Sequence, residues 1–367
     1  MTITGHARQI AAHVRMVGKG ALGEVYKIIS MAQQNHQGSR WHSGSSVYSP
    51  QIVMKFCKYY SNEEMPDTLD ASIRSEVALQ TELAQADLTP GVYGYVVSQF
   101  YIPKDFEQPE LVAKKIKLPA TWHGHYIFMG DGGPSLERYG IGPAFLNALP
   151  PESLPSTFEA KSPQSSTEAP PKPRIKEPIP TTLRFRITLV LRALECLMEV
   201  HKLGYVHGDI HPKQFVADQE LANVKLIDWG SGCRIETSAH EQRVDPHEHE
   251  AGEMVREAWH APEIRDFEVD GKNVPADVYH IVYTMLLSVI SELIAPEEPF
   301  VYKEPAKRTE QLQHYFELLR KISPDFAVLM AGYLDPNPES RTFDLEPLIH
   351  ALHELMTQYD LHWTPEE

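Results

Sequence analysis

Apolar and polar positions follow different patterns in the two parts of the chain. In the first third, short apolar runs bounded by glycine and polar residues are typical of β-strands, and they predict strands at residues 14–17, 24–30, 52–57, 92–102 and 125–129. Residues 70–86 differ, because their apolar side chains recur at helical intervals. We therefore expect a small β-rich region that contains one helix.

Helical periodicity dominates after residue 182. Apolar residues keep a helical period from Leu183 to Leu197, and Gly204 supplies a C-terminal stop. Residues 278–295 are the most apolar later stretch, but polar residues interrupt it and it is short for a membrane span. We predict a buried helix there, no membrane span, and an α+β fold in which a small β-rich lobe precedes a larger helical lobe.

Two polar stretches separate these regions. Residues 143–180 hold ten of the 29 prolines and almost no aromatic or β-branched residues, so they cannot bury enough surface to offset their ordering entropy. We predict a mostly disordered insertion, which could dock a partner through polyproline segments or serve only as a linker. Residues 32–49 are predicted to form a long polar loop.

Composition excludes several classes of protein. The net charge of −16 argues against a general binder of nucleic acid or of anionic membranes. The three cysteines, Cys57, Cys196 and Cys233, are far apart, which excludes a disulfide framework and a cysteine zinc site. The first residues lack the apolar core of a signal peptide. We expect an intracellular protein, cytoplasmic or nuclear.

Residues 18–25, GKGALGEV, place three glycines between two predicted strands. Backbone N–H groups at such glycines can approach phosphate oxygens closely. A glycine-rich hairpin turn is the alternative. A dinucleotide site would need a helix after the glycines, whereas the following EVYKIIS is strand-like.

Two charged residues of the N-terminal third form a predicted pair. Lys55 lies inside the apolar strand IVMKF, where a buried ammonium group needs an anionic partner. Glu76 on the predicted helix is the expected partner, and Glu82 is the second choice. The alternative is an edge-strand lysine that faces solvent.

Two aspartates in the C-terminal part end apolar segments. Asp209 belongs to HGDIHPKQ and Asp228 to LIDWG. Such a pair suits a site with one acidic metal ligand and one carboxylate that orients a hydroxyl. Either aspartate alone could also be an Asx turn or a helix cap.

The ordered set of the glycine motif, strand lysine, helix glutamate, HGD, DWG and APE resembles the eukaryotic-type protein kinase family, from Gly18 to Arg341. The resemblance implies a two-lobed protein kinase-like fold. Its parts would be an N-lobe at 1–130, a hinge and the start of the C-lobe at 131–142, the insertion at 143–180, and the C-lobe at 181–360.

The resemblance also implies an ATP site. The residues that would line it are Val17, Gly18, Gly20, Gly23, Val25, Met129, Gly130, Gly132 and Ser135. The motif glycines would cover the phosphates, Val25 would pack on adenine, and Met129 would be the gatekeeper. Lys55, paired with Glu76, would hold the α- and β-phosphates.

Besides Lys55 and Glu76, the resemblance implies catalytic roles for Asp209 and His211 and metal-binding roles for Asp228 and Gln214. Asp209 would orient the substrate hydroxyl and accept its proton, and Asp228 would bind Mg²⁺ or Mn²⁺. Gln214 stands where the family has an asparagine metal ligand, and its amide is one methylene further out; a misplacement of ~1 Å can cost ~100-fold in rate. His211 replaces a lysine and carries less positive charge at pH 7, so it would support the γ-phosphate less.

Other matches to the family are structural. Asp277 would anchor the catalytic loop, and Arg341 would pair with Glu263 of APE. Gly208 replaces an arginine whose charge is neutralised in many relatives by a phosphorylated activation loop. We therefore predict activation without loop phosphorylation. Residues 240–250 are rich in His and carboxylates, and a solvated acidic loop explains them more simply than a metal site.

We expect an ATP- and Mg²⁺-dependent protein kinase that phosphorylates Ser or Thr in a protein substrate. Two alternatives remain open. A pseudokinase would bind nucleotide with little transfer, as Gln214 and His211 suggest. A small-molecule kinase of the aminoglycoside or choline type would also carry a motif such as HGDIHP.

Overall fold

The computed structural model describes residues 10–19, 24–33, 52–58, 67–101, 121–142, 182–218, 223–235, 261–262, 273–295 and 305–362. These residues fall into two compact units that divide after Asp131. We call residues 10–131 the N-terminal unit and residues 132–362 the C-terminal unit. The predicted insertion at 143–180 lies outside the described residues.

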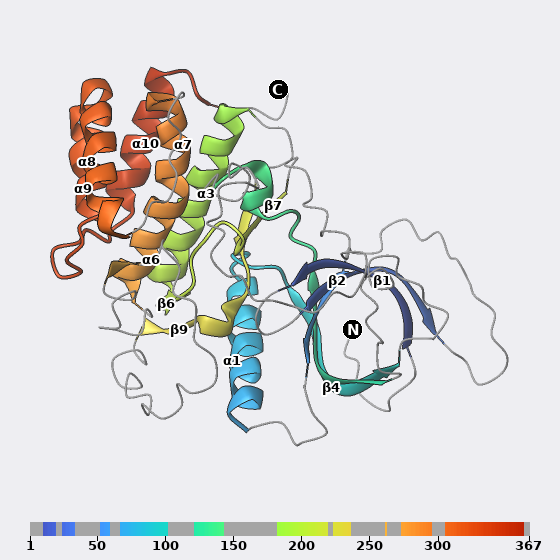
Figure 1. Cartoon of the computed structure of the whole chain (residues 1–367). Coiled ribbons are helices and arrows are strands. Elements are labelled where there is room, and N and C mark those ends of the chain that lie inside the picture. Colours follow the sequence, from blue (N-terminus) through green and yellow to red (C-terminus); the bar gives the residue numbers. More distant parts are fainter. Residues whose placement is uncertain are drawn as a thin grey trace, which may run out of the picture. The chain divides into compact units, whose positions relative to one another are not determined.

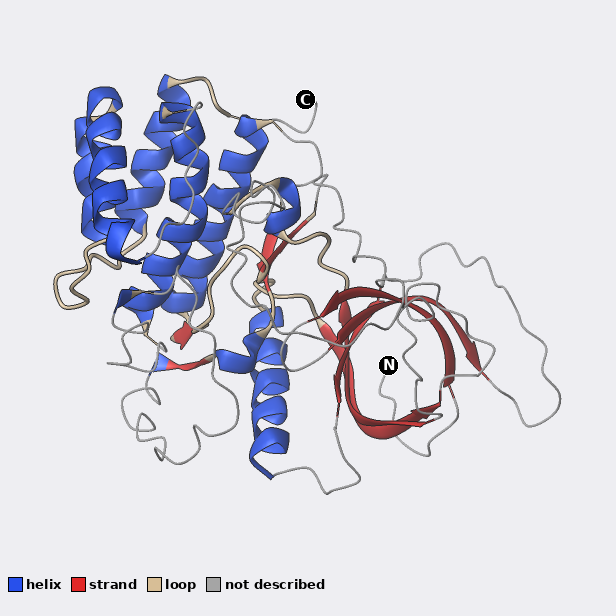
Figure 2. Ribbon diagram, viewed as in Figure 1, coloured by secondary structure: helices blue, strands red, loops and turns tan. Residues whose placement is uncertain are grey.

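The N-terminal unit is an antiparallel sheet with one helix (Figure 1). Its strands are β1 (Ile10–Lys19), β2 (Glu24–Gln33), β3 (Ile52–Lys58), β4 (Val92–Tyr101) and β5 (Thr121–Gly130), and its helix is α1 (Asp67–Ala84). They lie in the order β1-β2-β3-β5-β4, and Figure 2 shows that the sheet is strongly curved. The five predicted strands and the predicted helix are confirmed. Ala32 and Gln33 correct the loop prediction, because they extend β2.

The core of the N-terminal unit lies between α1 and one face of the sheet. Val53 of β3 is opposite Met129 of β5, so both side chains lie on the same face. There they pack with Cys57, Ile127 and, from α1, Ile73. Burial of this face fixes the register, since a slip of one residue would turn its apolar side chains to the other side.

The C-terminal unit is mostly helical (Figure 2). Its longer helices are α3 (Leu183–Lys202), α6 (Val274–Ile281), α7 (Leu287–Ile294), α8 (Pro305–Ile322), α9 (Pro324–Tyr333) and α10 (Glu346–Gln358). Short elements join them: η1 (Leu136–Tyr139), β6 (Tyr205–Val206), β7 (Phe215–Ala217), β8 (Val224–Leu226), η3 (Trp229–Ser231) and β9 (Cys233–Arg234). Strand β6 pairs with β9, and β7 pairs with β8.

Helix α3 begins and ends where its sequence predicts. The Thr182 side chain caps the first turn by accepting a hydrogen bond from the Phe185 amide at 3.2 Å. Gly204 follows the last turn with a φ of +85°, and its amide donates to the His201 carbonyl. The predicted helix with its glycine stop is therefore confirmed.

The central helix of the C-terminal unit runs from Val274 to Ile294 and consists of α6, a π-helical segment η5 (Val282–Leu286) and α7. Its serine and threonine hydroxyl groups bond to its own backbone; Thr284, for example, donates to the His280 carbonyl at 2.7 Å. This lets a helix that carries Ser and Thr be buried on nearly all sides. The predicted buried helix is confirmed, but it begins four residues earlier than predicted.

By length and composition alone this central helix could cross a membrane, with a mean hydropathy of 1.4 in its most apolar window. However, 83% of that window is buried inside the structure, and a core helix passes the same test. The described residues show an α+β fold with small antiparallel sheets and several helices.

Candidate functional site

Lys55 and Glu76 form a buried ion pair in the N-terminal unit. The Lys55 Nζ lies 2.5 Å from Glu76 Oε1, and the two residues are only 7% and 3% exposed. Strand β3 supplies the lysine, and α1, which packs on the same face of the sheet, supplies the glutamate. The predicted pair is confirmed. Glu82, the second choice, lies exposed one and a half turns further along α1.

The same face of the sheet carries two of the residues predicted to line the ATP site. Val25 is opposite Lys55 in the β2–β3 register and packs, partly buried, against the cluster that contains Met129. The Gln80 amide donates to the Met129 sulfur at 3.4 Å and to the Pro90 carbonyl at 3.2 Å. Val25, Lys55 and Met129 therefore lie together on one face.

The start of β2 and the end of β5 are joined by a second ion pair. Lys27 Nζ lies 2.8 Å from Asp131 Oδ2, reaching past β3, which lies between the two strands. The Gly130 amide donates to the Gly91 carbonyl at 2.9 Å. These contacts hold the last residues of β5, the strand that ends in the predicted hinge.

The first residues of the C-terminal unit pack on strand β7. Ser135 forms an antiparallel bridge with Val216, and the Pro134 carbonyl accepts a hydrogen bond from the Ala217 amide at 3.0 Å. Gly133 has a φ of +94°, and a Cβ atom there would collide with the Ala217 carbonyl. Only glycine fits this position. The sequence reasoning missed Gly133 and Val216, although the Gly-Gly-Pro run signals a tight turn.

A buried aspartate holds the backbone of the HGD motif. Asp277, in the first turn of α6, accepts hydrogen bonds from the amides of His207 at 2.7 Å and Gly208 at 2.9 Å. His201 Nε2 lies 3.3 Å from the same carboxylate. Burial alone would raise the pKa of Asp277, but the His201 hydrogen bond and charge and the His207 contacts hold this pKa below its ordinary value.

The HGD and DWG segments are joined through Ile227. His207 Nε2 lies 2.9 Å from the Ile227 carbonyl, and the Ile227 amide donates to the Gln214 carbonyl at 2.7 Å. His207 Nδ1 accepts the Asp209 amide at 3.3 Å, which assigns the ring proton to Nε2. Because Gln214 and Ile227 flank the β7–β8 hairpin, Asp209 and Asp228 both lie near its one end.

The side chain of Asp209 is oriented by two neighbours in its own loop. Gln214 Nε2 donates to Asp209 Oδ2 at 2.8 Å, and His211 Nε2 lies 3.5 Å from the same oxygen. His211 Nδ1 accepts the Lys213 amide at 3.3 Å, so Nε2 carries the ring proton that faces Asp209. Among the described residues both side-chain contacts of this carboxylate go to Oδ2.

The Asp209 carboxylate is accessible and ionised. Its side chain is 39% exposed, so a substrate group can reach it. Burial would raise the pKa of Asp209, but hydrogen bonds from His211 and Gln214 and the nearby histidines outweigh that effect and hold this pKa well below its usual range. The arrangement can accept a hydrogen bond from a hydroxyl at neutral pH.

Asp228 and Gln214 are the residues that could hold a metal ion. Carboxylate and amide oxygens are the ligand types that Mg²⁺ prefers, so the donor set fits the predicted ion. Asp228 has φ +64° and ψ +65°, an uncommon conformation for a residue with a side chain, directly before η3. The described residues contain no group of three or more His, Cys, Asp or Glu side chains suited to a metal.

The remaining predicted residues belong to β1, to the C-terminal unit, or to parts of the chain outside the described residues. Val17 and Gly18 belong to β1, with Gly18 opposite Val25. Gly20, Gly23 and Glu263 lie outside the described residues. Arg341 donates to the Asp335 carbonyl at 2.9 Å and lies over the Tyr279 ring, with its guanidinium carbon 4.7 Å from the centroid. Its predicted pair with Glu263 stays a prediction.

No protein-family model matches the chain, and no curated protein matches its sequence.

Proposed function

We propose that the chain is an ATP-dependent protein kinase with a two-lobed fold, and that it transfers the γ-phosphate of ATP to a Ser or Thr hydroxyl of a protein. The observation that carries this proposal is the orientation of Asp209. Gln214 and His211 both engage Oδ2, while Asp277 fixes the backbone on which Asp209 stands. Phosphoryl transfer depends on such positioning more than on covalent chemistry.

The nucleotide would use the face of the sheet that carries Lys55. The ion pair with Glu76 keeps the Lys55 ammonium in one place, which is what a group that holds the α- and β-phosphates needs. Val25 and Met129 offer an apolar surface beside it for adenine. Gly130, Gly132 and Ser135 belong to the segment that would follow the base and ribose.

The metal ligands would be Asp228 and the amide oxygen of Gln214. A bound Mg²⁺ or Mn²⁺ supplies charge that neutralises the phosphate oxygens. The Gln214 amide nitrogen donates to Asp209, so its planar amide can turn the oxygen toward an ion while the nitrogen holds the carboxylate. This dual use suits a residue that is only 7% exposed.

Asp209 would bind the substrate hydroxyl through Oδ1. Because its pKa is held low, the carboxylate remains ionised at neutral pH and directs the hydroxyl oxygen toward the phosphorus. The hydroxyl proton would pass to this carboxylate as the new O–P bond forms and the bond from the γ-phosphorus to the β,γ-bridging oxygen breaks, which releases ADP. His211, with its Nε2 proton toward Asp209, keeps the carboxylate from rotating.

The test is transfer of labelled phosphate from ATP with Mg²⁺ or Mn²⁺ to generic protein and small-molecule acceptors. Transfer to protein should fall by at least ~100-fold in Asp209→Asn and in Lys55→Ala, since each removes a group that acts on the transition state. Lys202→Ala is the control, because Lys202 is an exposed residue whose ion pair is with Glu199. Nucleotide binding without transfer would favour a pseudokinase, and labelling of small molecules alone would favour a small-molecule kinase.

A further inference from the structure

The turn that precedes residue 143 lies against the catalytic loop. Gly142 has a φ of +117°, and a Cβ atom placed on it would lie 2.8 Å from Cγ of Pro212. Pro212 is buried and sits directly after His211 in HGDIHPKQ. The backbone of one segment therefore touches a rigid ring of the other, at a distance that leaves no room for a side chain at position 142.

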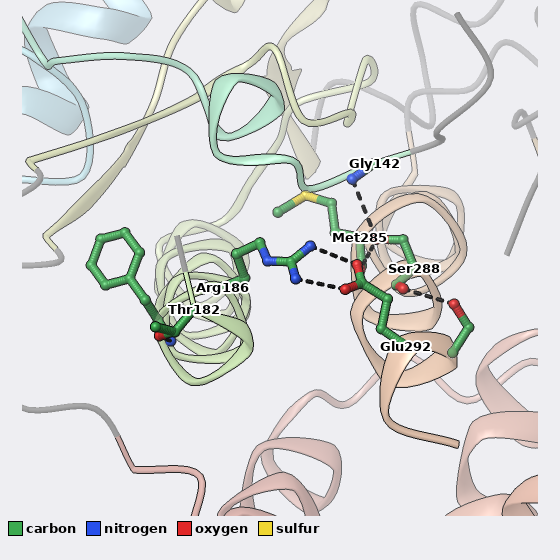
Figure 3. Close-up of polar contacts among 8 residues, drawn as sticks. Gly142, Thr182, Arg186, Met285, Ser288 and Glu292 are labelled. Atoms are coloured by element: carbon green, nitrogen blue, oxygen red, sulfur yellow. Dashed lines mark hydrogen bonds and ion pairs between the residues drawn. The ribbon is translucent and has the colours of Figure 1, made fainter. Parts of the chain in front are cut away.

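Gly142 is also held by the central helix. Its amide donates to Ser288 Oγ at 3.3 Å, and Ser288 Oγ in turn donates to the Met285 carbonyl at 2.7 Å (Figure 3). Pro212 is held as well, because its carbonyl accepts the Glu137 amide at 3.3 Å. Gly142 is thus fixed by a residue of α7, and Pro212 by a residue of η1.

The start of α3 braces the same turn. Arg186 donates two hydrogen bonds to Glu292, each 2.6 Å long, which fastens the first turns of α3 to α7 (Figure 3). A Cβ atom on Gly140 would lie 3.7 Å from the Arg186 guanidinium, so this side chain packs beside the turn. A bidentate pair of this kind holds both direction and distance.

We propose that Gly142 is a positioning residue for the catalytic loop and acts through Pro212. The contact between Gly142 and Pro212 fixes the position of the backbone between His211 and Gln214, the two residues that orient Asp209. This inference rests on the proposed function, since it assigns Gly142 to the transfer reaction. A small side chain at position 142 pushes Pro212 away and moves the Gln214 and His211 donors off Oδ2.

The first experiment compares Gly142→Ala with Gly204→Ala in the full chain. Both glycines have positive φ, but a Cβ atom on Gly204 meets nothing within 4 Å, so Gly204→Ala measures backbone strain without the collision. We expect kcat to fall at least ~10-fold in Gly142→Ala, with KM for ATP within about 2-fold, because a shift below 1 Å suffices. Gly204→Ala should keep its kcat.

A second variant tests the route through Pro212. In Gly142→Ala/Pro212→Ala the colliding Cγ is absent, so kcat should recover relative to Gly142→Ala. Ser288→Ala removes the hydrogen bond to the Gly142 amide without changing the turn residue, and it stays informative if Gly142→Ala does not fold. It should lower kcat by about 3-fold, in line with one lost hydrogen bond.

A readout independent of turnover is the NMR signal of the His211 ring Cε1–H, assigned by its loss in His211→Ala. It should shift in Gly142→Ala and remain in place in Gly204→Ala. Equal loss of kcat in both glycine variants, or an unshifted His211 signal in a folded Gly142→Ala, overturns the positioning role. An inactive wild type overturns the proposed function instead, and the His211 signal then still decides whether Gly142 positions the loop.

Discussion

The two units hold their charged groups in different ways. In the N-terminal unit, Lys55 meets Glu76 in one short ion pair between β3 and α1. In the C-terminal unit, Asp277 accepts two backbone amides and lies beside His201, and Asp209 is engaged by Gln214 and His211. The first arrangement is an ion pair between two side chains, whereas the second is a network that joins helix α6 to the end of α3 and to the HGD segment.

The difference shows how each charge tolerates the loss of a partner. A buried ion pair leaves an uncompensated charge when either member is removed, but it can be replaced as a whole by apolar side chains. A network around backbone amides has no apolar substitute, because those amides stay in place and need an acceptor. Replacing both partners by apolar residues should therefore restore the stability of the N-terminal unit but not that of the C-terminal unit.

The largest effect is expected for Asp277→Ala. It leaves the buried amides of His207 and Gly208 without their acceptor, and at about 1–3 kcal/mol for each unsatisfied group the C-terminal unit should lose about 4 kcal/mol. The measurement is chemical unfolding of the full chain, with hydrogen exchange to locate the loss. Asp325→Ala is the matched control, since Asp325 also lies in the first turn of a helix but is exposed. Equal losses in both variants would contradict the network description.

The next effect concerns the ion pair of the N-terminal unit. Lys55→Met and Glu76→Leu should each cost about 3 kcal/mol, because each leaves one buried charge. The double variant should recover most of that loss in unfolding free energy while remaining inactive. If the double variant loses as much unfolding free energy as the two single variants together, Lys55 and Glu76 do not stabilise the unit as a pair.

The smallest effect is expected for Gln214→Ala. It removes one donor to Asp209 Oδ2 while His211 remains, so the free energy of unfolding should fall by only about 1 kcal/mol. Transfer activity should fall more steeply, by about 10-fold or more, because orientation is lost. Gln214→Asn separates the two roles of this residue: a shorter side chain that restores transfer would favour metal binding over contact with Asp209.

Regular elements of both units could be predicted from the sequence. Short apolar runs located the five strands, and Ile73 with Leu83 marked the helical face that also carries Glu76. The choice of Glu76 over Glu82 is explained by the same face, because Glu82 is exposed. Apolar periodicity reports burial, and burial is what places these side chains.

Side-chain and backbone detail at the candidate site was less predictable. The direction of the Gln214 amide depends on where Asp209 Oδ2 lies. That position depends in turn on the hydrogen bond from the Gly208 amide to Asp277. The need for glycine at positions 133 and 142 comes from a positive φ and from neighbours distant in the chain, Ala217 and Pro212. No local pattern encodes such close approaches.

The contacts that α7 makes with Gly142 and Arg186 have a practical consequence. Ser288 and Glu292 are one turn apart on this helix. Ser288 accepts a hydrogen bond from Gly142, and Glu292 accepts hydrogen bonds from Arg186. Contacts with α7 therefore fix both Gly142 and Arg186. The entropic free-energy cost of closing the connection between these two residues should rise only slowly with its length, by roughly 0.6 kcal/mol per doubling. The junction is thus a natural position for grafting a fluorescent domain or exchanging the intervening stretch.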